Sequence, residues 1–146
     1  MNKNDFINEL NKIGVILSEY QLNQLDKYYN MLVEYNKNIN LTAITEYDQV
    51  LLKHFYDSLT ITKAIELTNQ KICDIGTGAG FPGIVLKIAY PDLEITLVES
   101  LTKRCVFLNE VIKELDLKNI KVVNQRAEEF SQNNIEYFDI ITSRAV

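Results

Sequence analysis

Apolar residues change their spacing along the chain near residue 68. Before that point they recur every three or four positions, which is the spacing of an amphipathic helix. In the first two predicted helices the recurring positions are Phe6, Ile7, Leu10, Ile13, Leu22, Leu25, Tyr29 and Leu32. Gly14 is suited to end the first helix. Ser18 and Gln21 form a capping-box pattern that is suited to begin the second.

A third helix is predicted over residues 46–66, after an asparagine-rich stretch, "YNKNINLT", that favours turns. Its related faces carry Val50, Leu51, His54, Phe55, Ser58 and Leu59. After residue 68 short apolar runs alternate with helical segments. The four runs are "KICDI", "LEITLVE", "NIKVVN" and "YFDIITS", and the clearest helical segment between them is "TKRCVFLNEVIKELDL".

This alternation predicts βαβ units and a mostly parallel, doubly wound α/β sheet. We expect two parts, a helical segment over residues 1–67 that packs on an α/β core over residues 68–146. Only four strands are predicted, and the last run is followed at once by "SRAV". Because such sheets usually have about five or six strands, we expect the sequence to be part of a longer protein.

Four of the five glycines lie in one stretch, "CDIGTGAGFPG", at residues 73–83. A glycine-rich turn between a strand and a helix lets backbone N–H groups approach a ligand closely, and Pro82 suits a first helical position. Counted from Gly78, the stretch matches the GxGxxG pattern of dinucleotide sites. Counted from Gly76, directly after the strand, it reads GxGxG with Asp74 just before it, which favours a ligand with an amino-acid end and an adenosine. A tight turn without a ligand is the alternative.

Glu99 ends the second predicted strand, about 20 residues past the glycines. A carboxylate there can accept hydrogen bonds from both ribose hydroxyls, although an ordinary exposed acid is the alternative. Gly76, Gly78 and Glu99 therefore predict a nucleoside cofactor, with S-adenosylmethionine favoured.

Several motifs occur in order along the chain: "NLTAI", "KHFYDSL", "DIGTGAGFPGI", "TLVES", "RAEEF" and "FDIITSRAV". In these motifs the whole chain resembles the RsmG (GidB) family of bacterial methyltransferases. The resemblance implies a class I, Rossmann-like fold, S-adenosylmethionine as methyl donor, and N7 of a guanine in 16S ribosomal RNA as acceptor. It also implies that Gly76 and Phe81 contact the cofactor, that Ala127 and Glu128 flank its adenine, and that Arg144 lines the same pocket.

Methyl transfer to guanine N7 requires no general base, because N7 already carries an in-plane lone pair. Cys73 and Cys105 are expected to pack as small apolar residues rather than to act as nucleophiles. We therefore assign no catalytic residue with certainty. The candidates for positioning the reactants are Arg144, His54 and Lys53. The alternatives are a terminal surface arginine, a structural histidine, and a helix ion pair between Lys53 and Asp57.

Composition and charge limit the partners, the metal sites and the cellular location that can be expected. The formal net charge of −5 argues against indiscriminate binding of nucleic acid, but Lys103, Arg104 and Arg126 lie near strand ends, where they could form a basic rim for RNA. No apolar run approaches the roughly 18 residues that cross a membrane, and the cysteine spacing fits no zinc site. We expect a monomeric cytoplasmic protein without a metal, whose partner is 16S ribosomal RNA or the small ribosomal subunit. A non-catalytic fragment and an NAD-dependent oxidoreductase are the alternatives.

Overall fold

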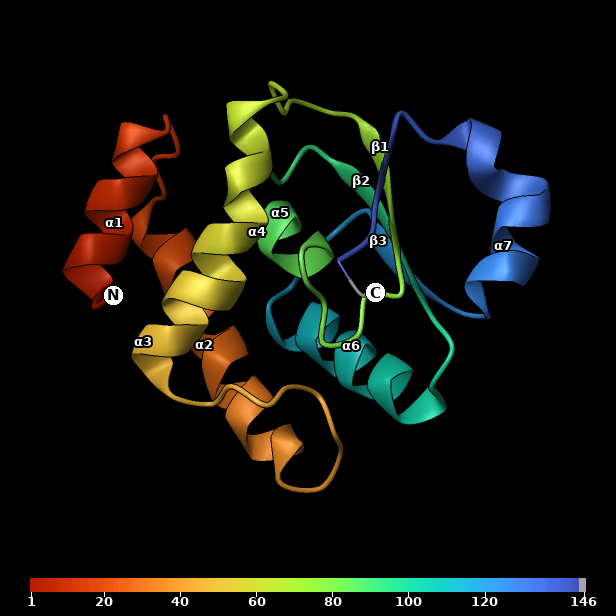
Figure 1. Ribbon diagram of the computed structural model, residues 1–146, viewed down its shortest axis with the longest axis horizontal. Helices are drawn as coiled ribbons and strands as arrows, with labels where there is room; N and C mark the ends of the chain where they lie inside the picture. Colours follow the sequence, from red (N-terminus) through yellow and green to blue (C-terminus); the bar gives the residue numbers. More distant parts are fainter. Residues whose placement is uncertain (145–146) are drawn as a thin grey trace.

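The computed structural model describes residues 1–144 (Figure 1). The strands are β1 (Lys71–Ile75), β2 (Glu94–Glu99), β3 (Ile120–Asn124) and β4 (Ile140–Thr142). The longer helices are α1 (Lys3–Lys12), α2 (Glu19–Asn36), α5 (Gly83–Ala89), α6 (Thr102–Glu114) and α7 (Ala127–Asn134). The shorter helical pieces are α3 (Tyr47–Val50), the π-helix η1 (Leu51–Tyr56), α4 (Asp57–Leu59), and the 3₁₀ turns η2 (Thr60–Lys63) and η3 (Ile135–Tyr137). Within the described residues, no helix has the length and apolar character to cross a membrane.

The predicted ends of the first two helices are confirmed. Gly14 follows α1 with a φ of +83°, a left-handed conformation that glycine adopts without steric cost. The Ser18 side chain accepts from the Gln21 backbone at 3.1 Å, and the Gln21 side chain accepts from the Ser18 backbone at 2.8 Å. Together these bonds form the capping box that begins α2.

The third predicted helix differs from the expectation in its interior and at its end. The chain is helical from Tyr47 to Lys63, but residues 51–56 form a π-helix and the last turn is 3₁₀. In the π segment the Asp57 N–H donates to the Leu52 carbonyl, one residue further back than in an α-helix. The spacing of apolar residues does not distinguish these hydrogen-bond patterns, so the π turn could not be predicted from it.

The sheet has the order β3-β2-β1-β4, and all of its pairs are parallel. Figure 1 shows α5 and α6 on one face of it and α7 on the other, with the N-terminal helices outside α5 and α6. All four predicted strands are present, although the fourth is shorter than expected, because residues 135–137 form the turn η3. The order in which strands are added to the sheet reverses at β1: β2 and β3 lie on one side of it and β4 on the other. In such sheets ligands bind at the carboxyl ends of the strands near this reversal.

Tyr28 of α2 connects the N-terminal helices to the glycine-rich loop. Its side chain is completely buried, its ring lies 5.5 Å from Phe55 and 5.6 Å from Phe81, and its hydroxyl donates to the Ala79 carbonyl at 2.5 Å. The predicted stripe assigned the neighbouring Tyr29 to the core, but Tyr29 is only half-buried. One hydrophobic core extends through both parts of the chain, so the core itself shows no boundary between them. The division after residue 67 remains a prediction.

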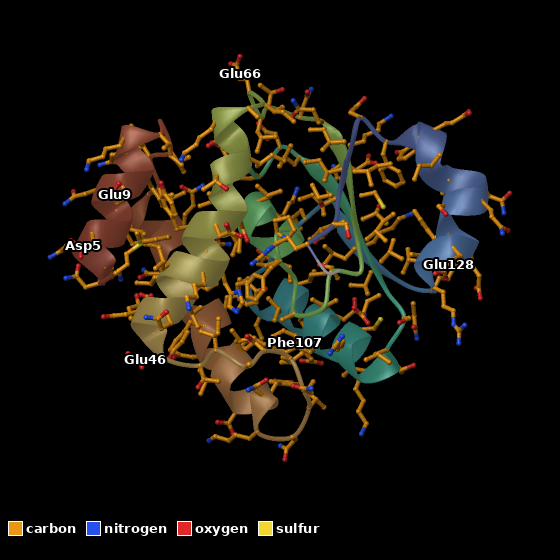
Figure 2. All side chains as sticks on the ribbon, in the orientation of Figure 1. Asp5, Glu9, Glu46, Glu66, Phe107 and Glu128 are labelled. Atoms are coloured by element: carbon orange, nitrogen blue, oxygen red, sulfur yellow. The ribbon has the colours of Figure 1, made fainter. Side chains whose placement is uncertain are left out.

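Acidic side chains mark the outer surface of the helical part. Figure 2 labels Asp5, Glu9, Glu46 and Glu66 at its periphery. The excess of negative charge thus includes positions away from the carboxyl ends of β1 and β2.

Candidate functional site

The loop between β1 and α5 is built from three glycines in left-handed conformations. Gly76, Gly78 and Gly80 have φ angles of +65°, +59° and +104°. The N–H groups of Gly76 and Thr77 both donate to the Val98 carbonyl, at 2.9 and 3.1 Å. The sequence therefore needs glycine here because the chain must turn sharply while it stays bonded to β2.

Asp74 holds this loop from beneath and is completely buried. Its carboxylate accepts from the Thr77 hydroxyl at 2.6 Å, the Gly83 N–H at 2.9 Å and the Thr142 hydroxyl at 3.1 Å. Burial raises the pKa of Asp74 to about 6, although these hydrogen bonds and the charge of Arg144 act in the opposite direction. Asp74 therefore joins β1, the loop, α5 and β4.

Glu99 is buried as well, with only 4% of its surface exposed, so the alternative of an ordinary exposed acid is wrong. One carboxylate oxygen accepts from the Gly78 N–H and the other from the Leu101 N–H, both at 2.9 Å. A carboxylate has about four acceptor positions, so two remain. The ribose contact remains a prediction, which this orientation of the carboxylate supports.

A cleft of about 410 Å³ opens at the carboxyl ends of β1, β2 and β3. Its lining residues are Gly76, Val98, Ser100, Gln125, Arg126, Ala127 and Glu128. The structure thus brings together Gly76, Ala127 and Glu128, three predicted cofactor residues from distant parts of the sequence. Arg126, which was expected on the RNA rim, lies in the same lining.

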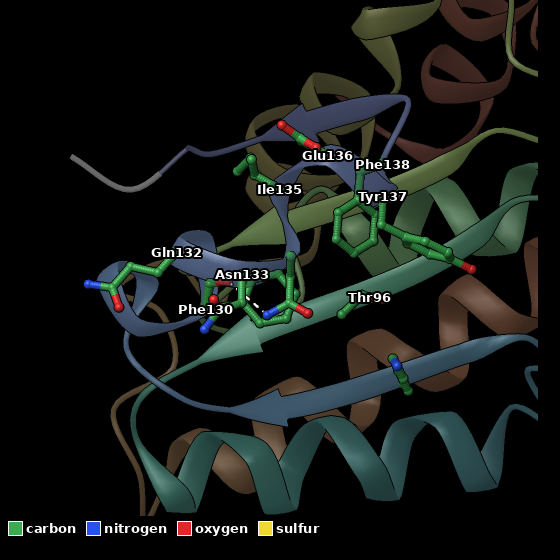
Figure 3. A pocket seen from close by; sticks show the side chains of 10 residues that line it. Thr96, Phe130, Gln132, Asn133, Ile135, Glu136, Tyr137 and Phe138 are labelled. Carbon is green, nitrogen blue, oxygen red and sulfur yellow. Dashed lines mark hydrogen bonds between the residues drawn. The ribbon is translucent and has the colours of Figure 1, made fainter.

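A larger cavity, of about 690 Å³, lies between the sheet and the α7–η3 segment, on the face of the sheet that α7 covers (Figure 3). It is bounded by Thr96 of β2, Lys121 of β3, and the segment from Phe130 to Phe138. None of the predicted site residues lines it. The smaller cleft is therefore the candidate site, because it lies where parallel sheets bind ligands.

Phe81, at the far end of the glycine loop, contacts two of the predicted positioning residues. The His54 ring stacks on it at 4.3 Å, with only 10° between the two planes, and the Arg144 guanidinium lies 5.7 Å from its centre. Arg144 also donates to the Lys53 carbonyl at 3.0 Å and forms an ion pair with Asp57 at 3.2 Å. Asp57 therefore pairs with Arg144 rather than with Lys53. Lys53 accepts a hydrogen bond from Arg144 through its backbone carbonyl, and its side chain is exposed.

Only one nitrogen of the His54 ring has a partner. Nε2 lies 2.8 Å from the Thr42 hydroxyl, whereas Nδ1 is buried and has no hydrogen bond within residues 1–144. Burial, followed by the charge of Arg144, lowers the pKa of His54 to about 4, and Asp57 opposes this shift. His54 is therefore neutral at physiological pH.

We expect the His54 side chain to titrate near pH 4 rather than near its ordinary pKa of 6.5. It is the only histidine of the chain, so its ring signals in an NMR titration need no assignment. The Arg144→Gln variant should raise this pKa, because it removes a nearby positive charge, whereas Lys113→Gln on the exposed end of α6 should leave it unchanged. Titration of the unmodified chain near 6.5 would contradict this description of the site.

The remaining predicted residues have different surroundings. Lys103 is exposed in the first turn of α6. The neighbouring Arg104 donates through Nε and Nη2 to the Asn40 carbonyl, at 3.2 and 2.9 Å, so its guanidinium is held by contacts within the chain. Cys73 and Cys105 are buried, and burial raises the pKa of both thiols. They pack as small apolar residues, as expected.

A model of the family described as GidB, rRNA small subunit methyltransferase G, matches residues 21–146. The chain belongs to this family. A ribosomal RNA small subunit methyltransferase G of Lachnoclostridium phytofermentans is 53% identical in an alignment 144 positions long, which covers 97% of this chain and 60% of the relative. One from Lysinibacillus sphaericus is 48% identical in an alignment 150 positions long, which covers all of this chain and 63% of the relative. The chain thus spans about 60% of the length of these relatives.

Solved structures show the same fold at low sequence identity. A protein-L-isoaspartate O-methyltransferase has a TM-score of 0.60 and 14% identity, over 97% of this chain and 47% of that one. A Plasmodium falciparum protein of the same description, in complex with S-adenosyl-L-homocysteine, has a TM-score of 0.59 and 16% identity, over 99% and 74% of the two chains. The fold is that of the class I methyltransferases. Membership of the rRNA small subunit methyltransferase G family supports the GxGxG counting of the glycine pattern and gives no support to the oxidoreductase alternative.

Sequence reasoning missed two features of the site. Tyr28 lies beside the predicted stripe and carries no motif. The segment that contains Asn40 and Thr42 was interpreted as a turn and as part of a family motif, without a contact to the site, although Thr42 contacts His54 and Asn40 contacts Arg104. The "NLTAI" motif was the available signal that this segment belongs to the site. It did not indicate the partners of Thr42 and Asn40, which lie 12 and 64 positions away along the chain.

Proposed function

We propose that this chain forms the cofactor-binding part of an S-adenosylmethionine-dependent methyltransferase that modifies N7 of a guanine in 16S ribosomal RNA. The observation that carries the proposal is the cleft at the strand ends, which combines Gly76, Ala127 and Glu128 with the glycine loop beside Glu99. Family membership supports the reaction and the acceptor. The S-adenosyl-L-homocysteine complex of the Plasmodium falciparum protein, which has the same fold, supports the cofactor.

Each predicted residue has a role that its chemistry supports. Gly76 and Gly78 allow the cofactor to approach the backbone without interference from a Cβ atom. Glu99 accepts the ribose hydroxyls through its free acceptor positions, and Ala127 and Glu128 flank the adenine. Arg144 offers a guanidinium to the carboxylate at the amino-acid end of the cofactor, beside Phe81.

The chain's own residues would position the reactants rather than transfer protons. S-adenosylmethionine would supply an activated methyl group to the lone pair of guanine N7; the carbon–sulfur bond would break as the carbon–nitrogen bond forms, and S-adenosylhomocysteine would leave. Alignment would therefore contribute most of the catalysis. His54, with a pKa of about 4, stays neutral beside Phe81. The neutral ring adds no charge of its own beside Phe81, where the Arg144 guanidinium already supplies a positive charge.

RNA binding is the part of the proposal that depends most on surface charge. Lys103 is exposed near the strand ends, and it would contact phosphate groups, as would Arg126 at the mouth of the cleft. Family membership and the bacterial relatives support 16S ribosomal RNA or the small subunit as partner and the bacterial cytoplasm as location. A monomeric state completes the proposal, and light scattering of the purified chain tests it.

Calorimetric titration with S-adenosylhomocysteine, with NAD in parallel, tests the cofactor site. We expect saturable binding of S-adenosylhomocysteine alone, and a loss of more than about tenfold in affinity for Gly76→Arg, because the new side chain would enter the cleft from a left-handed position. Gly14→Arg is the control: Gly14 is also left-handed, and a Cβ atom there would meet nothing within 4 Å. Binding of NAD alone would contradict the proposal.

The acceptor requires its own experiment. The chain is incubated with small ribosomal subunits and S-adenosylmethionine that carries a labelled methyl group, and nucleosides from the 16S RNA are analysed by mass spectrometry. We expect the label on N7-methylguanosine. Label on another base or another atom would contradict the proposed acceptor while leaving the cofactor site in place.

A further inference from the structure

The segment between α2 and α3 is an ordered loop that we call the Asn36–Ile44 loop. The Asn36 side-chain oxygen accepts from the backbone N–H groups of Leu41 and Thr42, at 2.9 and 3.0 Å. The Leu41 side chain is buried in the hydrophobic core, and the Ile44 side chain packs against that core. The loop therefore has a defined shape, and it presents the Asn40 carbonyl and the Thr42 hydroxyl at fixed positions.

The first of these groups leads to Glu99. The Asn40 carbonyl accepts from Nε and Nη2 of Arg104, and Nη1 of the same guanidinium lies 3.9 Å from the Glu99 carboxylate. A guanidinium can make both contacts because its donors are arranged in a rigid planar fork, which a lysine ammonium lacks. Arg104 is thus the connection between the loop and the carboxylate that is proposed to hold the ribose.

The second group leads to Phe81. The Thr42 hydroxyl oxygen accepts from the Ile44 N–H at 3.1 Å, so its own proton is available to Nε2 of His54, 2.8 Å away. Because Nδ1 of His54 has no partner in the described part of the chain, Thr42 makes the hydrogen bond that orients the ring. That ring stacks on Phe81 at the other end of the glycine loop.

We propose that the Asn36–Ile44 loop positions both ends of the cofactor site, with Arg104 and Thr42 as the positioning residues. The inference rests on the proposed function, since it assigns Glu99 and Phe81 to cofactor binding. It also gives Arg104 a role at the cofactor site rather than in RNA binding. Because coupling between two sites is reciprocal, cofactor binding should stabilise the loop to the same extent that the ordered loop strengthens cofactor binding.

Two substitutions test the two connections separately. Thr42→Val removes the hydroxyl and keeps the shape of the side chain, and Arg104→Lys keeps the charge and removes the fork. We expect each to weaken S-adenosylhomocysteine binding about tenfold in calorimetry, within the range usual for coupled sites. The matched controls are Thr45→Val, at an exposed position just after the loop, and Lys113→Arg, at an exposed position of α6. Both should bind as tightly as the unmodified chain.

Two further measurements separate positioning from a general loss of structure. The ring nitrogen signals of His54 should shift in Thr42→Val and not in Thr45→Val, while thermal unfolding shows that both variants fold. In the unmodified chain, S-adenosylhomocysteine should slow hydrogen exchange at the amides of Leu41 and Thr42. Folded variants that bind as tightly as their controls would overturn the inference and leave the proposed function standing. A lack of binding by the unmodified chain would overturn both.

Discussion

Replacing Gly80 with alanine is expected to destabilise the protein by about 3 kcal/mol, within the range of overpacked and strained positions. Gly80 has a φ of +104°, which side chains rarely adopt. A Cβ atom would lie 2.6 Å from the Tyr28 hydroxyl and 2.8 Å from Cδ1 of Ile84. Both neighbours are completely buried, and the Tyr28 hydroxyl is bonded to the Ala79 carbonyl, so neither can move without disturbing the core.

Gly78→Ala is the matched control for this experiment. Gly78 lies in the same loop with a φ of +59°, but a Cβ atom there would meet nothing within 4 Å. Only the cost of the left-handed backbone remains, about 1 kcal/mol. Urea unfolding of the two variants therefore separates packing from backbone strain. Equal losses in the two variants would show that Tyr28 and Ile84 do not confine Gly80.

The features of the fold that could be predicted are those that depend on residues close together in the sequence. The strand at residues 71–75, the glycine turn and the helix after it follow from local patterns, because alternation, glycine and apolar runs act within a few residues. The place of Glu99 at the end of β2 could be predicted for the same reason. Ala127 and Glu128 came from the family motif, since nothing in their own residue types indicates a cofactor.

The features that could not be predicted depend on contacts between distant residues. Tyr28 and Tyr29 are adjacent on one helix, and only the position of the glycine loop decides which of them is buried. Arg104 was assigned to RNA because a positive charge opens α6, but its partner Asn40 lies 64 residues away. The π turn at residues 51–56 places His54 over Phe81, and its hydrogen-bond pattern leaves no mark on the apolar spacing.

The helical part of the chain bears directly on the proposed chemistry. Tyr28 bonds the glycine loop, His54 stacks on Phe81, and Thr42 orients His54. None of these residues belongs to the four strands or to the helices that connect them. In this protein the α/β core supplies the cleft, and the preceding helices hold the glycine loop and Phe81 in place.

Asp74→Asn should change how stability depends on pH. The pKa of Asp74 is about 6 in the folded protein against an ordinary value of 3.8, because burial favours the neutral form. Between these values the folded state holds a proton that the unfolded state has released, so the contribution of Asp74 to stability falls as pH rises. From pH 4 to pH 7 the unmodified protein should lose on the order of 2 kcal/mol relative to Asp74→Asn.

The asparagine variant is expected to fold because its amide fits the same partners. Its oxygen can accept from the Gly83 N–H and the Thr77 hydroxyl, and its nitrogen can donate to the Thr142 hydroxyl, which is able to accept. His54 has the opposite pH dependence, since its lowered pKa makes stability fall as pH drops from 6.5 toward 4. Both proteins carry His54, so its effect cancels in their difference. A difference that instead grows in favour of the unmodified protein as pH rises would mean that the three hydrogen bonds and Arg144 outweigh the burial of Asp74.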